Sequence, residues 1–133
     1  MPRMALVVDD SMLVRHTICR FLEERGFAVA SAYNGQEALK ALAQRSPSLI
    51  VTDLDMPLMG GEELIRELKK RPHTAKIPVI VLTAKTLTKA ETEALARSTQ
   101  GLLHKNENWR ERLRTQLRQL TEQKQMSASA KES

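Results

Sequence analysis

Residues 49–57 read Leu49-Ile50-Val51-Thr52-Asp53-Leu54-Asp55-Met56-Pro57. The run before Asp53 is apolar, β-branched and too short for a helix, so it predicts a strand buried on both faces. Pro57 and Gly60-Gly61 then mark a loop before a helix that carries Leu64 and Leu68. A carboxylate directly after a buried strand lies where open parallel sheets bind their ligands.

The same strand–helix unit repeats on both sides of this stretch. Short apolar runs occupy Met4–Val8, Phe27–Ala32, Val79–Leu82 and Leu102–Leu103, and a segment with helical spacing of apolar residues follows each run. Because the runs do not alternate between apolar and polar residues, they predict a parallel sheet covered by helices on both faces. The expected fold class is therefore α/β, a three-layer, doubly wound sandwich. Thr88-Lys89-Ala90-Glu91 fits a capping box, and the helix after it carries mostly alanine and Leu95 on its apolar side, so this helix should be the most loosely packed.

Length and composition describe one ordinary globular domain. The 133 residues are 41% hydrophobic and 28% charged, which excludes wholesale disorder and a fibrous repeat. The longest apolar runs, such as Val79–Leu82, are far shorter than the roughly 20 residues that cross a bilayer. The N-terminal residues do not form a secretory signal, so we expect a cytoplasmic protein. The single cysteine, Cys19, cannot close an intrachain disulfide.

The domain is expected to span residues 1–125, with residues 126–133 as a disordered tail. The tail contains Ser127-Ala128-Ser129-Ala130 and offers no large apolar side chain to bury, so ordering it would cost entropy without any compensating gain.

The net charge of +5 is spread along the chain. The one dense basic run, Lys69-Lys70-Arg71, ends a predicted helix, where cations favour the helix dipole. This distribution argues against direct nucleic-acid binding.

Polar residues follow four of the five predicted strands. Asp9 and Asp10 follow the first strand, Asp53 the third, Thr83 the fourth and Lys105 the fifth. If the first and third strands are neighbours, three carboxylates crowd together and their pKa values rise unless a cation intervenes. An all-oxygen ligand set favours Mg²⁺, or Mn²⁺, over zinc. The lysine ammonium and the threonine hydroxyl could then bind a phosphoryl group on a carboxylate.

Each of these residues also has a purely structural interpretation. The acidic pair could cap the following helix, Asp53 and Thr83 could be turn residues, and Lys105 could be a solvated charge. Their joint position at the ends of four different strands, with complementary chemistry, favours a binding site over coincidence.

The sequence resembles the receiver domain of bacterial two-component response regulators over about residues 4–120. The resemblance rests on the acidic pair Asp9-Asp10, on residues 50–57 with Gly61, on Leu82-Thr83-Ala84 and on Lys105. It implies a flavodoxin-like receiver fold with five parallel strands in the order 2-1-3-4-5, which is a common order for doubly wound sheets.

The resemblance also implies a role for each matched residue. Asp53 would be the phosphoacceptor, while Asp9, Asp10, Asp53 and the backbone carbonyl of Asp55 would hold Mg²⁺. Thr83 and Lys105 would contact the phosphoryl oxygens. The donor would be a phosphohistidine on a sensor histidine kinase or a histidine phosphotransfer protein, with the downstream protein target left open. The chain would then catalyse only its own phosphoryl transfer and autodephosphorylation.

Some positions depart from the family pattern. Leu102 replaces the usual aromatic residue three positions before the lysine, so the usual aromatic rotation cannot occur there. Asn106 replaces the proline that often follows the lysine. These departures leave open a receiver-like adaptor that acts without phosphorylation. A second alternative is a small aspartyl-phosphate phosphohydrolase, since Asp53-Leu54-Asp55 is similar to the Asp-x-Asp pair of haloacid-dehalogenase-like enzymes.

Overall fold

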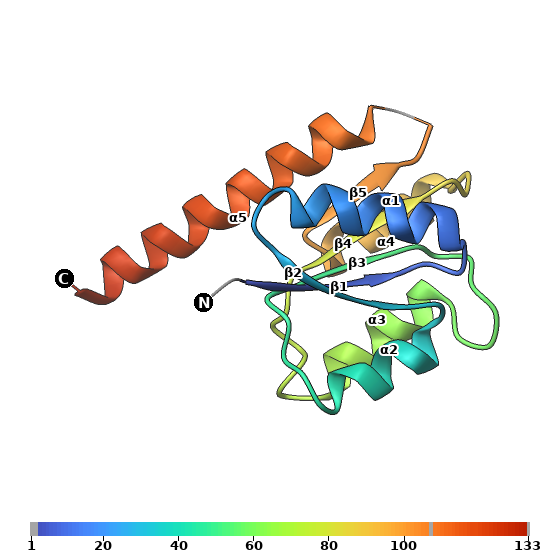
Figure 1. The fold of residues 1–133 in the computed structure, drawn as a ribbon, viewed down its shortest axis with the longest axis horizontal. Helices are drawn as coiled ribbons and strands as arrows, with labels where there is room; N and C mark the ends of the chain where they lie inside the picture. Colours follow the sequence, from blue (N-terminus) through green and yellow to red (C-terminus); the bar gives the residue numbers. More distant parts are fainter. Residues whose placement is uncertain (1–2, 107, 133) are drawn as a thin grey trace.

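The computed structural model describes residues 3–106 and 108–132, and their side chains as far as Glu122. Strands and helices alternate along the chain (Figure 1). The strands are β1 (Met4–Val8), β2 (Ala28–Ala32), β3 (Leu49–Thr52), β4 (Val79–Thr83) and β5 (Gly101–His104). The helices are α1 (Met12–Glu23), α2 (Gly35–Leu42), α3 (Gly61–Lys70), α4 (Lys89–Ser98) and α5 (Trp109–Glu132). The repeat predicted from the apolar runs is confirmed.

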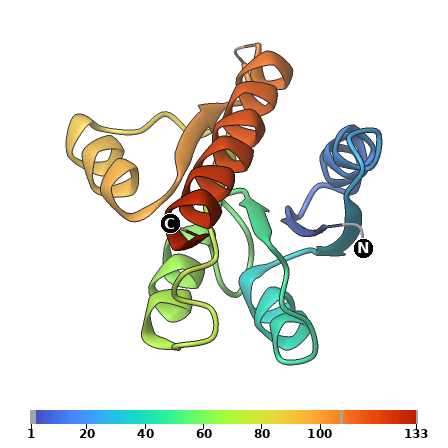
Figure 2. The same cartoon turned by 90° about the vertical axis from the view of Figure 1, so that its left-hand side faces the viewer.

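The strands form one parallel sheet in the order β2-β1-β3-β4-β5. Helices α1 and α5 lie on one face of the sheet, and α2 and α3 lie on the other (Figures 1 and 2). The three-layer, doubly wound fold and its strand order are therefore confirmed. Because all strands run in the same direction, their carboxyl ends share one edge of the sheet, at the right of Figure 1.

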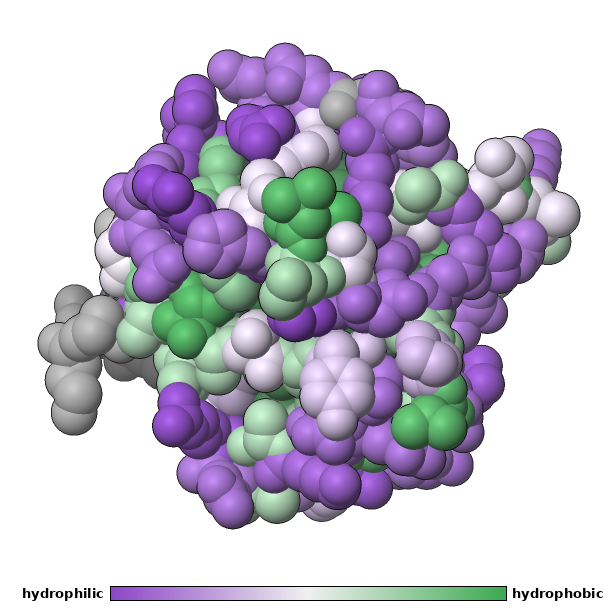
Figure 3. All heavy atoms as spheres, turned by 45° about the vertical axis from the view of Figure 1, so that its right-hand side comes forward, coloured by the Kyte–Doolittle hydropathy of each residue, from purple (hydrophilic) through white to green (hydrophobic). Residues whose placement is uncertain are grey.

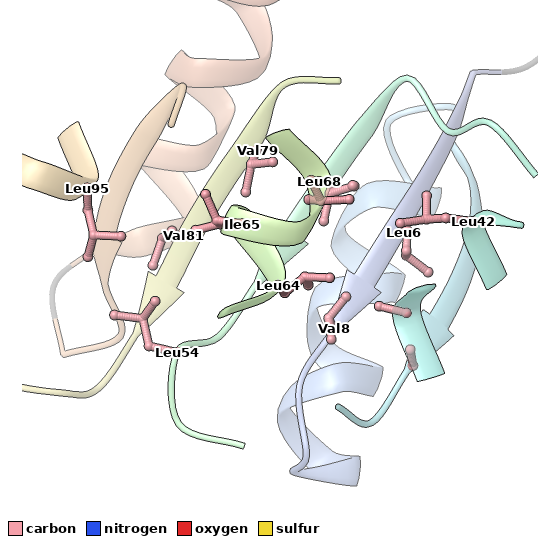
Figure 4. Packing of buried hydrophobic residues seen from close by; sticks show 13 residues of the cluster. Leu6, Val8, Leu42, Leu54, Leu64, Ile65, Leu68, Val79, Val81 and Leu95 are labelled. Atoms are coloured by element: carbon pink, nitrogen blue, oxygen red, sulfur yellow. The ribbon is translucent and has the colours of Figure 1, made fainter. Parts of the chain in front are cut away.

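Each face of the sheet has its own hydrophobic core, because successive side chains of a strand point to opposite faces. Leu6 and Ile50 point toward the core that α2, α3 and α4 cover, which Figure 4 shows. Val7 and Val51 point toward the core that α1 and α5 cover. Burial on both faces explains why the central strands β1, β3 and β4 are almost wholly apolar, whereas the edge strand β2 exposes Ala28 and Ser31. This packing holds the ends of the central strands in fixed positions.

Helix α4 packs more loosely than the other helices on its face. Leu95 is its one buried residue, whereas α3 buries Leu64, Ile65 and Leu68. The predicted capping box is present: the Thr88 hydroxyl accepts from the Glu91 N–H, and the Glu91 carboxylate accepts from the Thr88 N–H. The start of α4 is thus fixed by its own cap and only weakly by the core.

Helix α5 continues beyond the expected domain end. Among the side chains that the structure describes in this helix, the buried ones are Leu113 and Leu117, while the backbone stays helical to Glu132 and projects past the sheet (Figure 1). Alanine, lysine and glutamine, which occur in its last turns, favour helix by local propensity. The disordered tail from residue 126 stays a prediction, since the side chains after Glu122 lie outside the described part of the chain. Within that part, no helix has the length and apolarity to cross a membrane.

Candidate functional site

The register of the central strands brings the predicted acidic residues together. Strands β1 and β3 are neighbours, Val8 pairs with Thr52, and the Asp53 N–H donates to the Val8 carbonyl at 2.9 Å. The next residue of each strand is therefore an aspartate. One carboxylate oxygen from each of Asp9, Asp10 and Asp53 lies within 4.8 Å of the other two. This is the crowding that the sequence predicts for neighbouring first and third strands.

Lys105 lies between two of these carboxylates. Its Nζ atom is 2.8 Å from Oδ2 of Asp9 and 3.1 Å from Oδ2 of Asp53. Burial alone lowers the pKa of Lys105, but the hydrogen bonds and charges of both aspartates outweigh it, so the pKa is raised overall. The ammonium group therefore stays charged and partly neutralises the acidic cluster.

Asp9 connects the cluster to α1. Its Oδ1 atom accepts from the Ser11 N–H at 2.9 Å, and its backbone carbonyl accepts from Nη1 of Arg15 at 2.7 Å. Ser11, not Asp9, is the N-cap of the helix. Desolvation by burial raises the pKa of Asp9, with a smaller opposing effect from its bonds to Lys105 and Ser11. A buried carboxylate of this kind gains from a positive charge placed beside it.

Asp53 is held by its two neighbours in the chain. Its Oδ1 atom accepts from the Leu54 N–H at 2.7 Å, while its own carbonyl accepts from the Thr52 hydroxyl at 2.8 Å. The backbone of Gly61 lies close to that of Asp53. A Cβ atom added at Gly61 would lie 2.2 Å from the Asp53 carbonyl oxygen. The sequence predicts a loop at this glycine, but its closeness to Asp53 depends on the folded loop and does not follow from the residue pattern.

Thr83 is buried at the end of β4, next to the strand of Lys105. The Lys105 N–H donates to the Thr83 carbonyl at 2.8 Å, and the Thr83 hydroxyl accepts from the Lys85 N–H at 3.0 Å. The Lys85 side chain lies 3.7 Å from Oε1 of Glu62 and 3.8 Å from Oε2 of Glu91. A continuous series of contacts thus runs from the threonine to the capping box of α4. The sequence pattern does not predict this pairing of Lys85.

The remaining positions named from the sequence also lie at or near this edge. Asp55 is exposed on the loop after β3, in which Leu58 has a positive φ of 68°. Leu102 pairs with Val81 and packs against the core on the α2–α4 face.

Large apolar side chains are also exposed on the molecule, namely Met12, Leu13, Tyr33 and Leu58. Figure 3, which brings the carboxyl-end edge toward the viewer, shows apolar groups scattered among polar ones.

The acidic cluster fits a hard divalent cation. Its donors are carboxylate oxygens from three residues on adjacent strands, close enough to share one ion. Oxygen donors alone are the set that Mg²⁺ and Mn²⁺ prefer. The geometry is therefore consistent with the metal that the sequence predicts.

A family model described as the response regulator receiver domain matches residues 5–118. The chain belongs to this family. It is a receiver domain of the kind that acts in two-component signalling, and the phosphoacceptor role of such domains is consistent with the carboxylate cluster described above.

Individual relatives agree with this assignment. The chain is 39% identical over 100 residues to a probable transcriptional regulator ycf29 from Pyropia yezoensis, covering 75% of this chain and 45% of that protein. The signal receiver domain of a signal transduction histidine kinase from Syntrophus aciditrophicus is 30% identical, with a TM-score of 0.79 and 89% of each chain covered.

A third relative is the response regulator protein TrrA from Thermotoga maritima, solved in complex with Mg²⁺-BeF. It is 27% identical, with a TM-score of 0.77, and the match covers 89% of this chain and 98% of that one. The chain spans less than half the length of curated relatives such as ycf29 and the phosphate regulon protein PhoB of Rhizobium meliloti, where it covers 45% and 37%.

Proposed function

We propose that Asp53 accepts a phosphoryl group from a phosphohistidine on a sensor histidine kinase or a histidine phosphotransfer protein. The observation that carries the proposal is the Lys105 ammonium, which lies 3.1 Å from Oδ2 of Asp53 and 2.8 Å from Oδ2 of Asp9. A carboxylate oxygen that becomes phosphorylated needs a cation beside it, because negative charge accumulates on the phosphoryl oxygens.

The transfer is an exchange of one bond for another at phosphorus. A carboxylate oxygen of Asp53 forms the new bond while the bond to the histidine nitrogen breaks, and the imidazole leaves with the bonding electron pair. The Leu54 N–H fixes the orientation of the Asp53 carboxylate through Oδ1. Lys105 would exchange a carboxylate oxygen for a phosphoryl oxygen as its partner. The rate then depends mainly on positioning and charge.

The metal-binding residues would be Asp9, Asp10, Asp53 and the backbone carbonyl of Asp55. Mg²⁺ bound there supplies positive charge next to the phosphoryl oxygens. The metal complex of the related TrrA, solved with Mg²⁺-BeF, supports this part of the proposal. Mn²⁺ is expected to substitute because it accepts the same oxygen ligands.

Thr83 and Lys85 would carry the response toward α4. When the Thr83 hydroxyl turns to a phosphoryl oxygen, it gives up the Lys85 N–H that it now accepts at 3.0 Å. The Lys85 side chain reaches both α3 and α4 through Glu62 and Glu91, so a shift of this loop alters the start of α4. Since α4 buries only Leu95, it can change position at low cost. The output is a changed protein-interaction surface that a partner protein reads in the cytoplasm.

The decisive experiment is the intact mass of the protein after incubation with acetyl phosphate, with and without Mg²⁺. The wild type is expected to gain one phosphoryl group only when Mg²⁺ is present, and Asp53→Asn is expected to gain none. Glu63→Gln is the matched control, because that carboxylate is exposed on α3 and has no proposed role in the site. It should be phosphorylated like the wild type.

Other outcomes would replace the proposal with one of its alternatives. If the wild type gains no mass and does not bind beryllofluoride, the chain is a phosphorylation-independent adaptor. Steady hydrolysis of a generic phosphomonoester, lost in Asp53→Asn, would instead indicate a phosphohydrolase. The expected chemistry is limited to phosphorylation and dephosphorylation of the chain itself, within a domain of residues 1–125.

A further inference from the structure

Two adjoining hollows lie at the amino-terminal ends of the strands, the edge of the sheet that faces the viewer in Figure 2 and lies opposite Asp53. Their volumes are about 530 Å³ and about 520 Å³, and Arg3, Phe27 and Leu117 line both. Small-molecule sites commonly have volumes of this size. The lining side chains therefore determine which ligand fits these hollows.

The first hollow is surrounded by guanidinium groups from separate parts of the chain. Arg3 precedes β1, Arg25 follows α1, and Arg114 and Arg118 lie one turn apart on α5. Among the described residues that line either hollow there is no aspartate or glutamate. Within the described side chains, one ion pair involves these arginines: it joins Arg114 to Glu111 at 3.4 Å, and both side chains are exposed. The hollow therefore concentrates positive charge that its own lining does not neutralise.

Most of these guanidinium groups retain donors for a ligand. Arg25 is held in place, since its Nη1 donates to the Phe21 carbonyl at 2.9 Å and its guanidinium lies 3.5 Å from the centre of the Phe21 ring. Arg3 donates one hydrogen bond, to the Thr121 hydroxyl at 3.2 Å. Arg118 makes no hydrogen bond or ion pair with the residues that the structure describes. Because a guanidinium has five N–H donors, most of the donor capacity is unused.

The second hollow supplies an apolar wall beside the charged one. Phe27 and Leu117 are shared, and Ile77, Pro78 and Leu120 extend the wall, with Lys76 adding a further cation. A ligand that fills both hollows needs a compact group of several negative charges and an apolar or aromatic part next to it.

We propose that these hollows form a binding site for a small polyphosphate ester with an aromatic part, such as a nucleoside diphosphate. Like charges held close together favour a multivalent counter-charge, and a diphosphate carries more negative charge than a carboxylate. Arginine also matches phosphate oxygens with paired N–H donors. The site is separate from Asp53, so it does not depend on the proposed phosphoacceptor function.

The test is an NMR titration of the ¹⁵N-labelled chain with ADP and with pyrophosphate, in EDTA so that no metal enters the carboxylate cluster. ADP should shift the amides of Gly26 and Phe27, and it should bind more tightly than pyrophosphate because the base contacts the apolar wall. The double variant Arg114→Gln with Arg118→Gln should bind ADP about tenfold or more weakly, as expected for the loss of charge-assisted hydrogen bonds.

The control is the pair Arg66→Gln with Lys89→Gln, which removes the same charge from exposed positions on α3 and α4 that line neither hollow. It should leave ADP affinity within about twofold of the wild type, since distant exposed charges are screened. Equal weakening in both pairs would show a general charge effect and overturn the proposal. Tighter binding of pyrophosphate than of ADP, the absence of shifts at millimolar ADP, or preferential binding of an oligonucleotide through the same amides would also overturn it.

Discussion

The Nζ atom of Lys105 lies 2.8 Å from Oδ2 of Asp9, although β1 and β5 are separated in the sheet by β3 and β4. The Asp9 side chain is only 1% exposed and that of Lys105 is 17% exposed. The ion pair therefore connects distant strands across the carboxyl-end edge. It gives Lys105 a structural role in addition to its proposed role with the phosphoryl group.

Lys105→Met should destabilise the fold. The variant leaves the buried carboxylate of Asp9 and the nearby Asp53 without their common cation, which costs several kcal/mol for a fully buried pair. Since Lys105 is partly exposed, we expect a loss of about 1–3 kcal/mol in the free energy of unfolding. Urea denaturation of both proteins in metal-free buffer measures this loss.

The matched control for that variant is Lys85→Met. Lys85 also contacts two carboxylates, but at 3.7 Å and 3.8 Å and with its side chain 36% exposed. Exposed pairs contribute about 0–1 kcal/mol, so this variant should remain close to the wild type in stability. Equal losses in the two variants would contradict a special role for the buried pair.

The same ion pair predicts how stability changes at alkaline pH. The pKa of Lys105 is raised in the folded protein above its ordinary value of 10.5, so folding favours the charged form. Its contribution is complete below pH 10.5 and is lost as the pH rises through the higher folded value. Urea denaturation across this range should show a steeper alkaline loss in the wild type than in Lys105→Met. Parallel pH profiles would mean that Lys105 titrates alike in the folded and unfolded chains.

Gly61→Ala should disturb Asp53 from the opposite side. A Cβ atom at residue 61 would lie 2.2 Å from the Asp53 carbonyl oxygen, and this neighbour is backbone that cannot rotate away. We expect a loss of about 2–4 kcal/mol and weaker phosphorylation by acetyl phosphate, because the loop must move with Asp53. Thermal denaturation and intact mass provide the two measurements.

Gly101→Ala is the control for this substitution. The added Cβ atom would lie 2.9 Å from the side chain of Gln116, which can change its rotamer. Its effect on stability should be smaller than that of Gly61→Ala, and its phosphorylation should be unchanged. If Gly101→Ala were the more damaging variant, backbone closeness to Asp53 would not be the limiting contact.

The sequence predicts the fold well because the central strands β1, β3 and β4 are buried on both faces. Runs such as Leu49–Thr52 are apolar throughout, so their lengths and the intervening helices determine a parallel sheet. The carboxylate cluster is predictable for the same reason, since Asp9 and Asp53 follow strands whose ends share an edge. The roles assigned to these residues still rest on the family resemblance.

Contacts between residues distant in the chain are not predictable in this way. Lys85 meets Glu62 of α3 only after the fold has brought the loop after β4 beside that helix. The arginines at the opposite edge come from separate segments, and one of them, Arg3, precedes the first strand. A pattern of single residues carries no signal for such clusters, because their spacing in the sequence is irregular.

The capping box of α4 should respond to acid. Hydrogen bonds from Thr88 lower the pKa of Glu91 below its ordinary value of 4.5, with a smaller contribution from Lys85. The contribution of Glu91 to stability is therefore present above pH 4.5 and is lost as the pH falls through the folded value. An NMR titration should show the Thr88 amide shifting with the Glu91 carboxyl group. Glu91→Gln keeps an acceptor for the Thr88 N–H but cannot titrate, so its Thr88 amide should stay constant, whereas Glu93→Gln on the same helix should behave like the wild type. An acid shift that persists in Glu91→Gln would assign the effect to another group.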